Sequence, residues 1–128
     1  MEVADEIVVI NEGRVEQIGT PDQLYDKPAN DFVMGFLGEV TRLGDVQLRP
    51  HDVEVSTSPG LPGSISGRIT RQLRVGFEVR LVVTTEGGGD VNVVLTRTHA
   101  RSLELDEGVQ VWLTPAVGAI TVPAMVAV

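Results

Sequence analysis

The sequence predicts a mainly β protein, in which a small β-barrel follows a β-hairpin and two short helices. Two observations indicate the barrel: from about residue 46 onward, short segments alternate apolar and polar residues, and glycine-containing turns separate them. A third observation indicates the helices, because two capping signals occur between residues 20 and 38. The 128 residues contain no cysteine, so we expect the fold to depend on a hydrophobic core and not on disulfides.

The first predicted element is a hairpin, with strands at residues 7–10 and 14–18. Gly13 marks its turn, because glycine readily adopts a positive φ. Alternation places Val15 and Ile18 on the inward side of the second strand. A lone two-stranded hairpin is marginally stable in water. We therefore expect it to belong to a sheet that precedes this chain, and here to fold back on the barrel or to exchange between chains.

Two short helices are predicted next. Thr20 and Gln23 have the spacing of a capping box, and Pro28 ends the first helix. Asn30 is a suitable cap for the second helix, and Gly38 is a suitable end. One face of this second helix is apolar, so the pair must pack on another surface. That face carries Phe32, Val33, Phe36 and Leu37.

The remaining elements are predicted to be strands, apart from one helical turn at residues 98–105 that begins at Thr98 as its cap. Residues 87–89 are a glycine triplet that opens no helix, so it indicates a hairpin loop and not a phosphate loop. Trp112 lies in an alternating strand and is expected in the core. Residues 117–128 would complete the barrel, cover an edge strand or form a dimer contact. The predicted strands are residues 46–50, 52–56, 63–73, 75–85, 91–95, 109–113 and 119–122.

The charge is unevenly distributed along the chain. The net charge is −8, and residues 1–45 carry −7 of it, with ten acidic against three basic side chains. The barrel segment is nearly neutral and contains two aromatic residues, Phe77 and Trp112. Single-stranded nucleic-acid modules need basic grooves and stacking aromatics, so the sequence excludes nucleic acid as a partner. The change in charge also indicates a boundary close to residue 45.

A dense pattern between residues 19 and 33 identifies a family. It consists of Gly19, Thr20, Pro21, Tyr25, Pro28, Phe32 and Val33. With the hairpin before it, this pattern resembles the C-terminal part of ATP-binding subunits of bacterial ABC importers. The resemblance implies that residues 1–38 are the C-terminal remnant of a nucleotide-binding domain, made of the hairpin and linker helices. Residues 39–128 would then form an OB-like, transport-associated regulatory domain.

The segment from Leu48 to Asp52, which reads LRPHD, resembles the form found in the sulfate and thiosulfate subgroup. The resemblance implies a homodimer of the subunit, permease subunits as membrane partners, and a position on the cytoplasmic face of the plasma membrane. The parent subunit would bind ATP and magnesium. This chain contains no G-x-x-x-x-G-K-[ST] loop, so we expect it to lack ATPase activity and to bind no cofactor or metal.

Arg49, His51 and Asp52 are the candidate site residues. The guanidinium of Arg49 offers a planar set of donors suited to an oxyanion, and His51 would add a donor that depends on protonation. The alternative is a structural strand end, in which Pro50 bends the chain and Asp52 caps the turn or pairs with Arg49. The structural alternative is favoured, because short motif matches carry false positives.

Four arginines lie along the two central strands of the predicted barrel. Strict alternation would place Arg68 and Arg74 on one face and Arg71 on the other. All four, including Arg80, are either anion contacts or solvated side chains that pair with acidic neighbours. The second alternative is favoured for each of them. The acidic candidates are Glu54, Glu78 and Glu104.

Two functions remain open at this point. The first is a regulatory and dimerisation domain of an ABC importer subunit, which would hold two subunits together across a two-fold axis. The second is a free-standing barrel that binds an oxyanion, related to the molybdate-binding modules of this architecture. The first 38 residues favour the first function, because an independent anion carrier does not need them.

Overall fold

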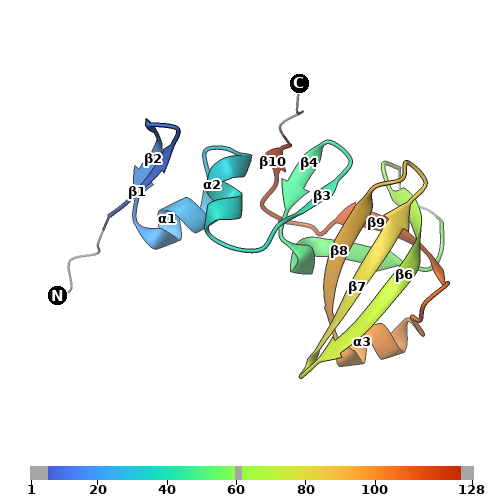
Figure 1. Cartoon of the computed structure of the whole chain (residues 1–128). Helices are drawn as coiled ribbons and strands as arrows, with labels where there is room; N and C mark the ends of the chain where they lie inside the picture. The colour runs from blue at the N-terminus through green and yellow to red at the C-terminus, as the bar shows by residue number, and fades with distance from the viewer. Residues whose placement is uncertain (1–5, 60–61, 125–128) are drawn as a thin grey trace.

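The structure, a computed structural model, describes residues 6–59 and 62–124. The chain runs from a two-stranded hairpin through two short helices into a barrel built from a small sheet and a larger one (Figure 1). The mainly β fold with a preceding hairpin and two short helices is therefore confirmed. Among the described residues, every helix is too short or too polar to cross a membrane.

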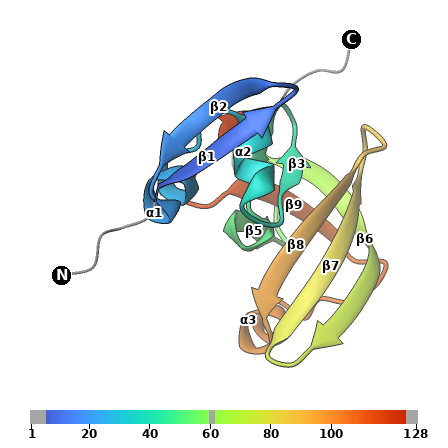
Figure 2. The ribbon, with the colours of Figure 1, turned by 60° about the vertical axis from the view of Figure 1, so that its left-hand side comes forward.

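The hairpin consists of β1 (Ile7–Asn11) and β2 (Arg14–Gly19). It packs on the two helices, separate from the β6–β8 strands of the barrel, so the expectation that it folds back on the barrel is wrong (Figure 2). Val15 and Ile18 are also not inward, since they are 57% and 56% exposed. The inward residue is Val9, which is fully buried, because the helices cover the opposite face of the hairpin.

The helices α1 (Pro21–Asp26) and α2 (Asp31–Phe36) begin at the predicted caps. Thr20 and Gln23 form a complete capping box, and the Asn30 side chain accepts a hydrogen bond from the backbone of Val33. Helix α2 contributes to two separate apolar clusters. Val33 packs with the hairpin and α1, whereas the next residue, Met34, belongs to the barrel core.

The barrel combines two antiparallel sheets. Its smaller sheet has the order β10-β4-β3, and its larger sheet has the order β5-β9-β6-β7-β8. A short 3-10 helix, η1 (Pro50–Asp52), connects the two sheets, and α3 (Arg97–Ser102) follows β8. The strands are β3 (Thr41–Leu43), β4 (Val46–Leu48), β5 (Val53–Ser56), β6 (Ile65–Val75), β7 (Glu78–Thr85), β8 (Asp90–Thr96), β9 (Gln110–Pro115) and β10 (Val122–Pro123).

The two sheets meet at the edge of β8. The backbone N–H of Asn92 donates a 2.8 Å hydrogen bond to the hydroxyl of Thr41, which joins β8 to β3. The C-terminal segment helps to complete the barrel through β10, which pairs with β4, while residues 125–128 lie outside the described residues. The core is aliphatic and includes Leu48, Ile69, Leu81, Val93 and Leu113.

The helical turn and the tryptophan differ from the sequence prediction. Helix α3 begins at Arg97 with Thr96 as its cap, two residues earlier than predicted, because the Thr96 hydroxyl accepts from the N–H of His99. Trp112 is half-buried on the outer face of β9. Its neighbours Val111 and Leu113 are fully buried. Because successive residues of a strand point to opposite faces, Trp112 between them points away from the core, contrary to the prediction.

Strand β6 contains a bulge at Thr70, which changes the predicted faces of the arginines. Ile69 is opposite Val83, but Arg71 is opposite Val82, so one extra residue is inserted in β6. Arg71 therefore shares the outer face with Arg68. Arg74 is opposite the buried Val79 and is turned to the inner face, contrary to strict alternation.

Candidate functional site

The predicted site residues lie where the linker helices meet the barrel. Arg49 directly follows β4 and is only 4% exposed, which is unusual for a charged residue. Pro50 begins η1, and the N–H of Asp52 bonds to the carbonyl of Arg49 at 2.9 Å. This tight turn directs the Arg49 side chain back towards α1 and α2.

The guanidinium of Arg49 connects three segments of the chain. Its Nη1 donates to the carbonyl of Met34 at 2.9 Å and to the carbonyl of Glu39 at 3.1 Å. Its carbon lies 4.6 Å from the ring centre of Tyr25 in α1, a cation–π distance. A Cβ on Gly38 would lie only 3.3 Å from Nη1, so a glycine gives the guanidinium room at this point.

A second buried bond reinforces the same junction. The side chain of Gln47, in β4, donates a 2.7 Å hydrogen bond to the backbone carbonyl of Asp31 in α2. Gln47 is 6% exposed, so this bond is protected from water. We call Arg49 and Gln47 the linker clamp, because both side chains fasten the linker helices to the barrel.

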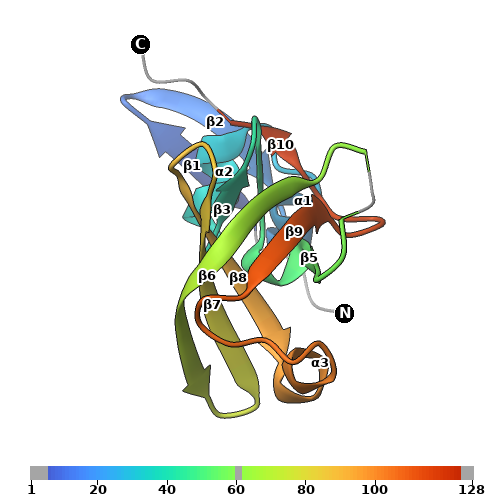
Figure 3. The ribbon, with the colours of Figure 1, turned by 90° about the vertical axis from the view of Figure 1, so that its right-hand side faces the viewer.

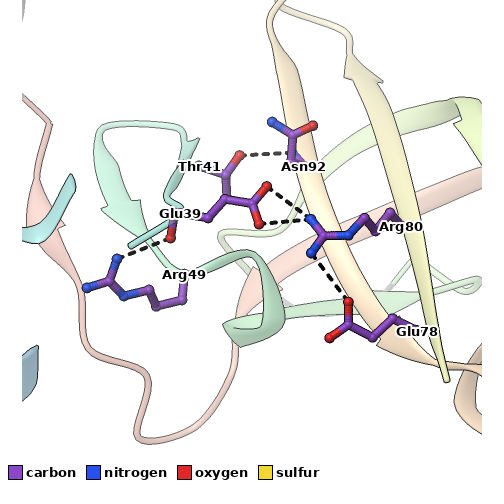
Figure 4. A network of polar contacts seen from close by, with 6 residues as sticks. All are labelled: Glu39, Thr41, Arg49, Glu78, Arg80 and Asn92. Atoms are coloured by element: carbon purple, nitrogen blue, oxygen red, sulfur yellow. Dashed lines mark hydrogen bonds and ion pairs between the residues drawn. The ribbon is translucent and has the colours of Figure 1, made fainter. Parts of the chain in front are cut away.

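An exposed ion-pair network lies beside the linker clamp (Figure 4). Arg80, in β7, donates to the carboxylate of Glu39 at 2.9 Å and to that of Glu78 at 3.3 Å. The hydrogen bond and charge of Glu39 raise the pKa of Arg80 above its ordinary value, so Arg80 stays cationic. The prediction that Arg80 pairs with an acidic neighbour is confirmed for Glu78, and Glu39 is the partner that the sequence did not reveal.

The other two predicted residues, His51 and Asp52, form no side-chain hydrogen bond or ion pair with the guanidinium of Arg49. His51 Nε2 lies 3.6 Å from a carboxylate oxygen of Asp52, and the His51 side chain is largely exposed. The predicted structural pairing of Asp52 with Arg49 is wrong, because the ion-pair contact of the Asp52 carboxylate is with His51, and the hydrogen bonds of the Arg49 guanidinium go to backbone carbonyls. Asp52 also provides no side-chain cap to η1.

Arg49 and His51 nevertheless share one cavity. It has a volume of about 370 Å³ and is lined also by Tyr25, Glu39 and Arg80. Nη2 of Arg49 is buried and has no hydrogen-bond partner in the structure. A buried donor without a partner is uncommon in folded proteins, and this one belongs to the guanidinium of a residue that lines the cavity. Asp52 is not among the residues that line this cavity.

Sequence reasoning missed Tyr25, Glu39 and Gln47 as parts of this site. Tyr25 belongs to the family pattern, and Glu39 and Gln47 carry no local signal, since Glu39 meets Arg49 and Gln47 meets Asp31 only through tertiary folding. In residues 6–59 and 62–124, no three His, Asp or Glu side chains gather closely enough to hold a metal ion.

The comparison with known families covers the barrel from β4 to β10. Residues 46–122 match the model of the TOBE domain. The chain belongs to the TOBE domain family. The structure agrees with this assignment, because the matched residues begin at β4 and end in β10, the two strands that pair in the smaller sheet.

Several relatives of this TOBE chain are named as import ATP-binding proteins. This chain is 40% identical over 124 residues to the sulfate/thiosulfate import ATP-binding protein CysA of Nocardia farcinica. The match covers 88% of this chain and 38% of that protein. The chain is 39% identical to the CysA protein of Mycolicibacterium paratuberculosis, covering 98% and 40% of the two chains. The CysA protein of Synechococcus elongatus is 40% identical, with 90% and 38% covered. The chain therefore spans less than half the length of these relatives.

A solved structure has a similar fold. The molybdate-bound cytoplasmic molybdate-binding protein ModG matches with a TM-score of 0.52 and 15% identity, covering 61% of this chain and 60% of that one. At this identity the likeness shows the fold alone. It supports the OB-like architecture that the sequence predicts for the barrel.

Proposed function

We propose that this chain is the C-terminal part of the ATP-binding subunit of a bacterial ABC importer for sulfate or thiosulfate. The observation that carries this proposal is the identity of 37–40% to proteins named for that role, together with the TOBE match. Residues 1–38 would be the end of the nucleotide-binding domain and residues 39–128 the regulatory and dimerisation domain. This part would not itself hydrolyse ATP. ATP and magnesium would bind to the nucleotide-binding domain of the subunit.

The exposed face of the hairpin supports the presence of a preceding domain. Val8 is opposite Ile18 and Ile10 is opposite Val15 on one side of the hairpin, and about half of each side chain is exposed. Such a continuous apolar face marks a contact surface. We propose that the nucleotide-binding domain covers it, and that permease subunits hold this assembly at the cytoplasmic face of the membrane.

The linker clamp supports a regulatory role for the barrel. Arg49 and Gln47 bind backbone carbonyls of α2 through buried hydrogen bonds, and Arg49 also binds the carbonyl of Glu39 after α2 through a partly buried one. Movement of the preceding domain would therefore be transmitted through α2 to the barrel as a rigid-body displacement. A pair of barrels joined in a dimer would keep two ATPase domains close together while they open and close.

Sulfate uptake tests this proposal. The chain would replace the corresponding C-terminal part of the Nocardia farcinica relative, in a bacterial strain that lacks its own ATP-binding subunit. We expect the chimera to restore uptake of labelled sulfate, and a chimera with Arg49→Ala to restore it less. If the chimera accumulates to the level of the relative but transports no more sulfate than the relative truncated before the barrel, the proposal is wrong.

A second candidate function is oxyanion sensing at the cavity beside Arg49. The buried Nη2 of Arg49, which has no partner in the structure, favours it. Calorimetric titration of the chain with sulfate, thiosulfate and molybdate tests this function, with Arg49→Ala as the control. Saturable binding that disappears in the variant supports a sensing domain. Absence of heat with all three anions would leave a purely structural role for Arg49, as the clamp of the linker.

A further inference from the structure

The tip of the β6–β7 hairpin is unusually apolar for an exposed turn. Phe77 is 89% exposed, and Leu73 and Val75 are 58% and 48% exposed. Gly76, with φ +60°, makes the turn between them, and this tip lies at the end of the barrel away from the linker helices (Figure 1). Three large apolar side chains at one protruding tip indicate a contact surface.

A cavity lies directly beside this tip and is lined by residues of β6, β7 and α3. Figure 3 shows α3 next to the end of these strands. It has a volume of about 370 Å³, and its floor is apolar, since it includes the buried side chains of Val79, Ala100 and Leu105. The N–H of Arg97 donates a 3.0 Å hydrogen bond to the carbonyl of Phe77, so the start of α3 is fixed next to the tip. A protruding aromatic side chain and an apolar hollow are therefore neighbours on one face.

The rim of this cavity carries unpaired charges of both signs. Arg97 and Arg101 are four residues apart and share one side of α3, and the bulge in β6 turns Arg74 into the same cavity. Glu104 and Asp106 complete the rim. Within the part of the chain that the structure describes, none of these five side chains forms an ion pair.

A two-fold dimer interface needs self-complementarity within one patch, because the same surface of both copies meets. We propose that a second copy of this chain binds here, with Phe77 of each copy inserted in the cavity of the other. The unpaired arginines of one copy then meet Glu104 and Asp106 of its partner. This inference rests on the proposed dimerisation function and assigns that function to a surface.

The mixture of charges favours a second copy over other occupants. A small anion would bind the three arginines, but it would leave Phe77 exposed and would be repelled by Glu104 and Asp106. An acidic protein would face the same repulsion. Only a surface that presents both signs and an apolar side chain satisfies all of these groups, and the chain itself has that surface.

The first test is the dimer dissociation constant of the chain, measured by sedimentation equilibrium for the wild type and Phe77→Ser. We expect the substitution to weaken the dimer by at least about tenfold, because buried aromatic anchors dominate interface energies. Val117→Ser is the matched control, since Val117 is also highly exposed but is not among the residues that line this cavity, and it should leave the constant unchanged. Circular dichroism confirms that each variant is folded.

Charge segregation provides a sharper test. One variant carries Arg97→Glu and Arg101→Glu, and the other carries Glu104→Arg and Asp106→Arg. Each variant alone should be monomeric, because like charges then meet across the two-fold axis. The equimolar mixture should form a heterodimer, because an acidic patch now meets a basic one. A merely structural role of these residues would not produce this recovery.

The outcomes separate this inference from the proposed function. If the wild type dimerises but neither Phe77→Ser nor charge segregation affects the dimer, the surface is wrong and the dimerisation function stands. If the wild type is monomeric at all concentrations, both the surface and the dimerisation function are wrong. A monomer in which the NMR signals of Arg97 and Arg101 shift with inorganic phosphate would instead identify an anion site and overturn the inference.

Discussion

Arg49 shows that a sequence motif can single out a residue without revealing what its side chain contacts. The sequence identifies it as part of a short RPHD segment, and the structure places its guanidinium against backbone carbonyls of Met34 and Glu39. The segment does not reveal which way the side chain turns, because that direction depends on η1 and on helices that lie before it in the chain. The residues that complete the site, Tyr25 and Glu39, are consequently not predictable from the motif.

Replacement of Arg49 should weaken the fold. In Arg49→Ala, the carbonyls of Met34 and Glu39 lose a charged donor in a buried place, and we expect a loss of about 2 kcal/mol in the free energy of unfolding. Urea unfolding followed by fluorescence of Trp112 measures it. Arg49→Lys keeps the charge but not the planar donor set, so its loss should be smaller. A change below about 0.5 kcal/mol in Arg49→Ala would contradict the role of the linker clamp.

At the scale of elements, the strands and caps could be predicted, and the bulge could not. Alternation locates β7, β8 and β9 because their inward residues are regularly apolar. The bulge at Thr70 follows from the pairing of β6 with β7, which no local pattern encodes, and it moves Arg74 to the inner face. The expected burial of Trp112 is wrong, because Val111 and Leu113 take the inward positions of β9 and the aromatic residue between them is on the other face.

Close strand packing makes Gly67 in β6 sensitive to substitution. A Cβ at this position would lie 2.7 Å from a methyl of Val83 and 2.8 Å from the carbonyl oxygen of Thr84. We expect Gly67→Ala to lower the free energy of unfolding by roughly 2–3 kcal/mol, since the β6–β7 pair must separate. Thermal unfolding measures this change. Gly87→Ala is the control, because a Cβ there meets nothing within 4 Å, and equal stability of both variants would contradict the prediction.

For the whole molecule, the sequence predicts the order of the parts but not their packing. The family pattern correctly indicates a hairpin, two helices and an OB-like barrel. The hairpin does not pack on the barrel, because Val9, Leu24 and Val33 form a cluster of their own between the hairpin and the helices. Such a choice between two possible packing partners depends on the complete three-dimensional arrangement.

The two faces of the hairpin should respond differently to polar substitution. Val9→Thr places a hydroxyl in the buried cluster, so we expect it to cost about 1–3 kcal/mol of stability. Ile18→Thr changes an exposed side chain and should alter the stability of this chain by less than about 0.5 kcal/mol. In the full-length subunit, Ile18→Thr should become destabilising, because the preceding domain is proposed to cover that face. Denaturant unfolding of both proteins checks this difference, and equal effects of Ile18→Thr would count against the proposed contact.

Helix α2 has a mechanical consequence for the molecule. Val33 and Met34 are consecutive, so their side chains project about 100° apart around the helix axis, and each is anchored in a different cluster. A rotation of α2 about its axis would move Val33 and Met34 out of their two clusters at the same time. The packing of both side chains therefore favours one orientation of the helix. We therefore expect a displacement of the hairpin to be passed to the barrel through α2.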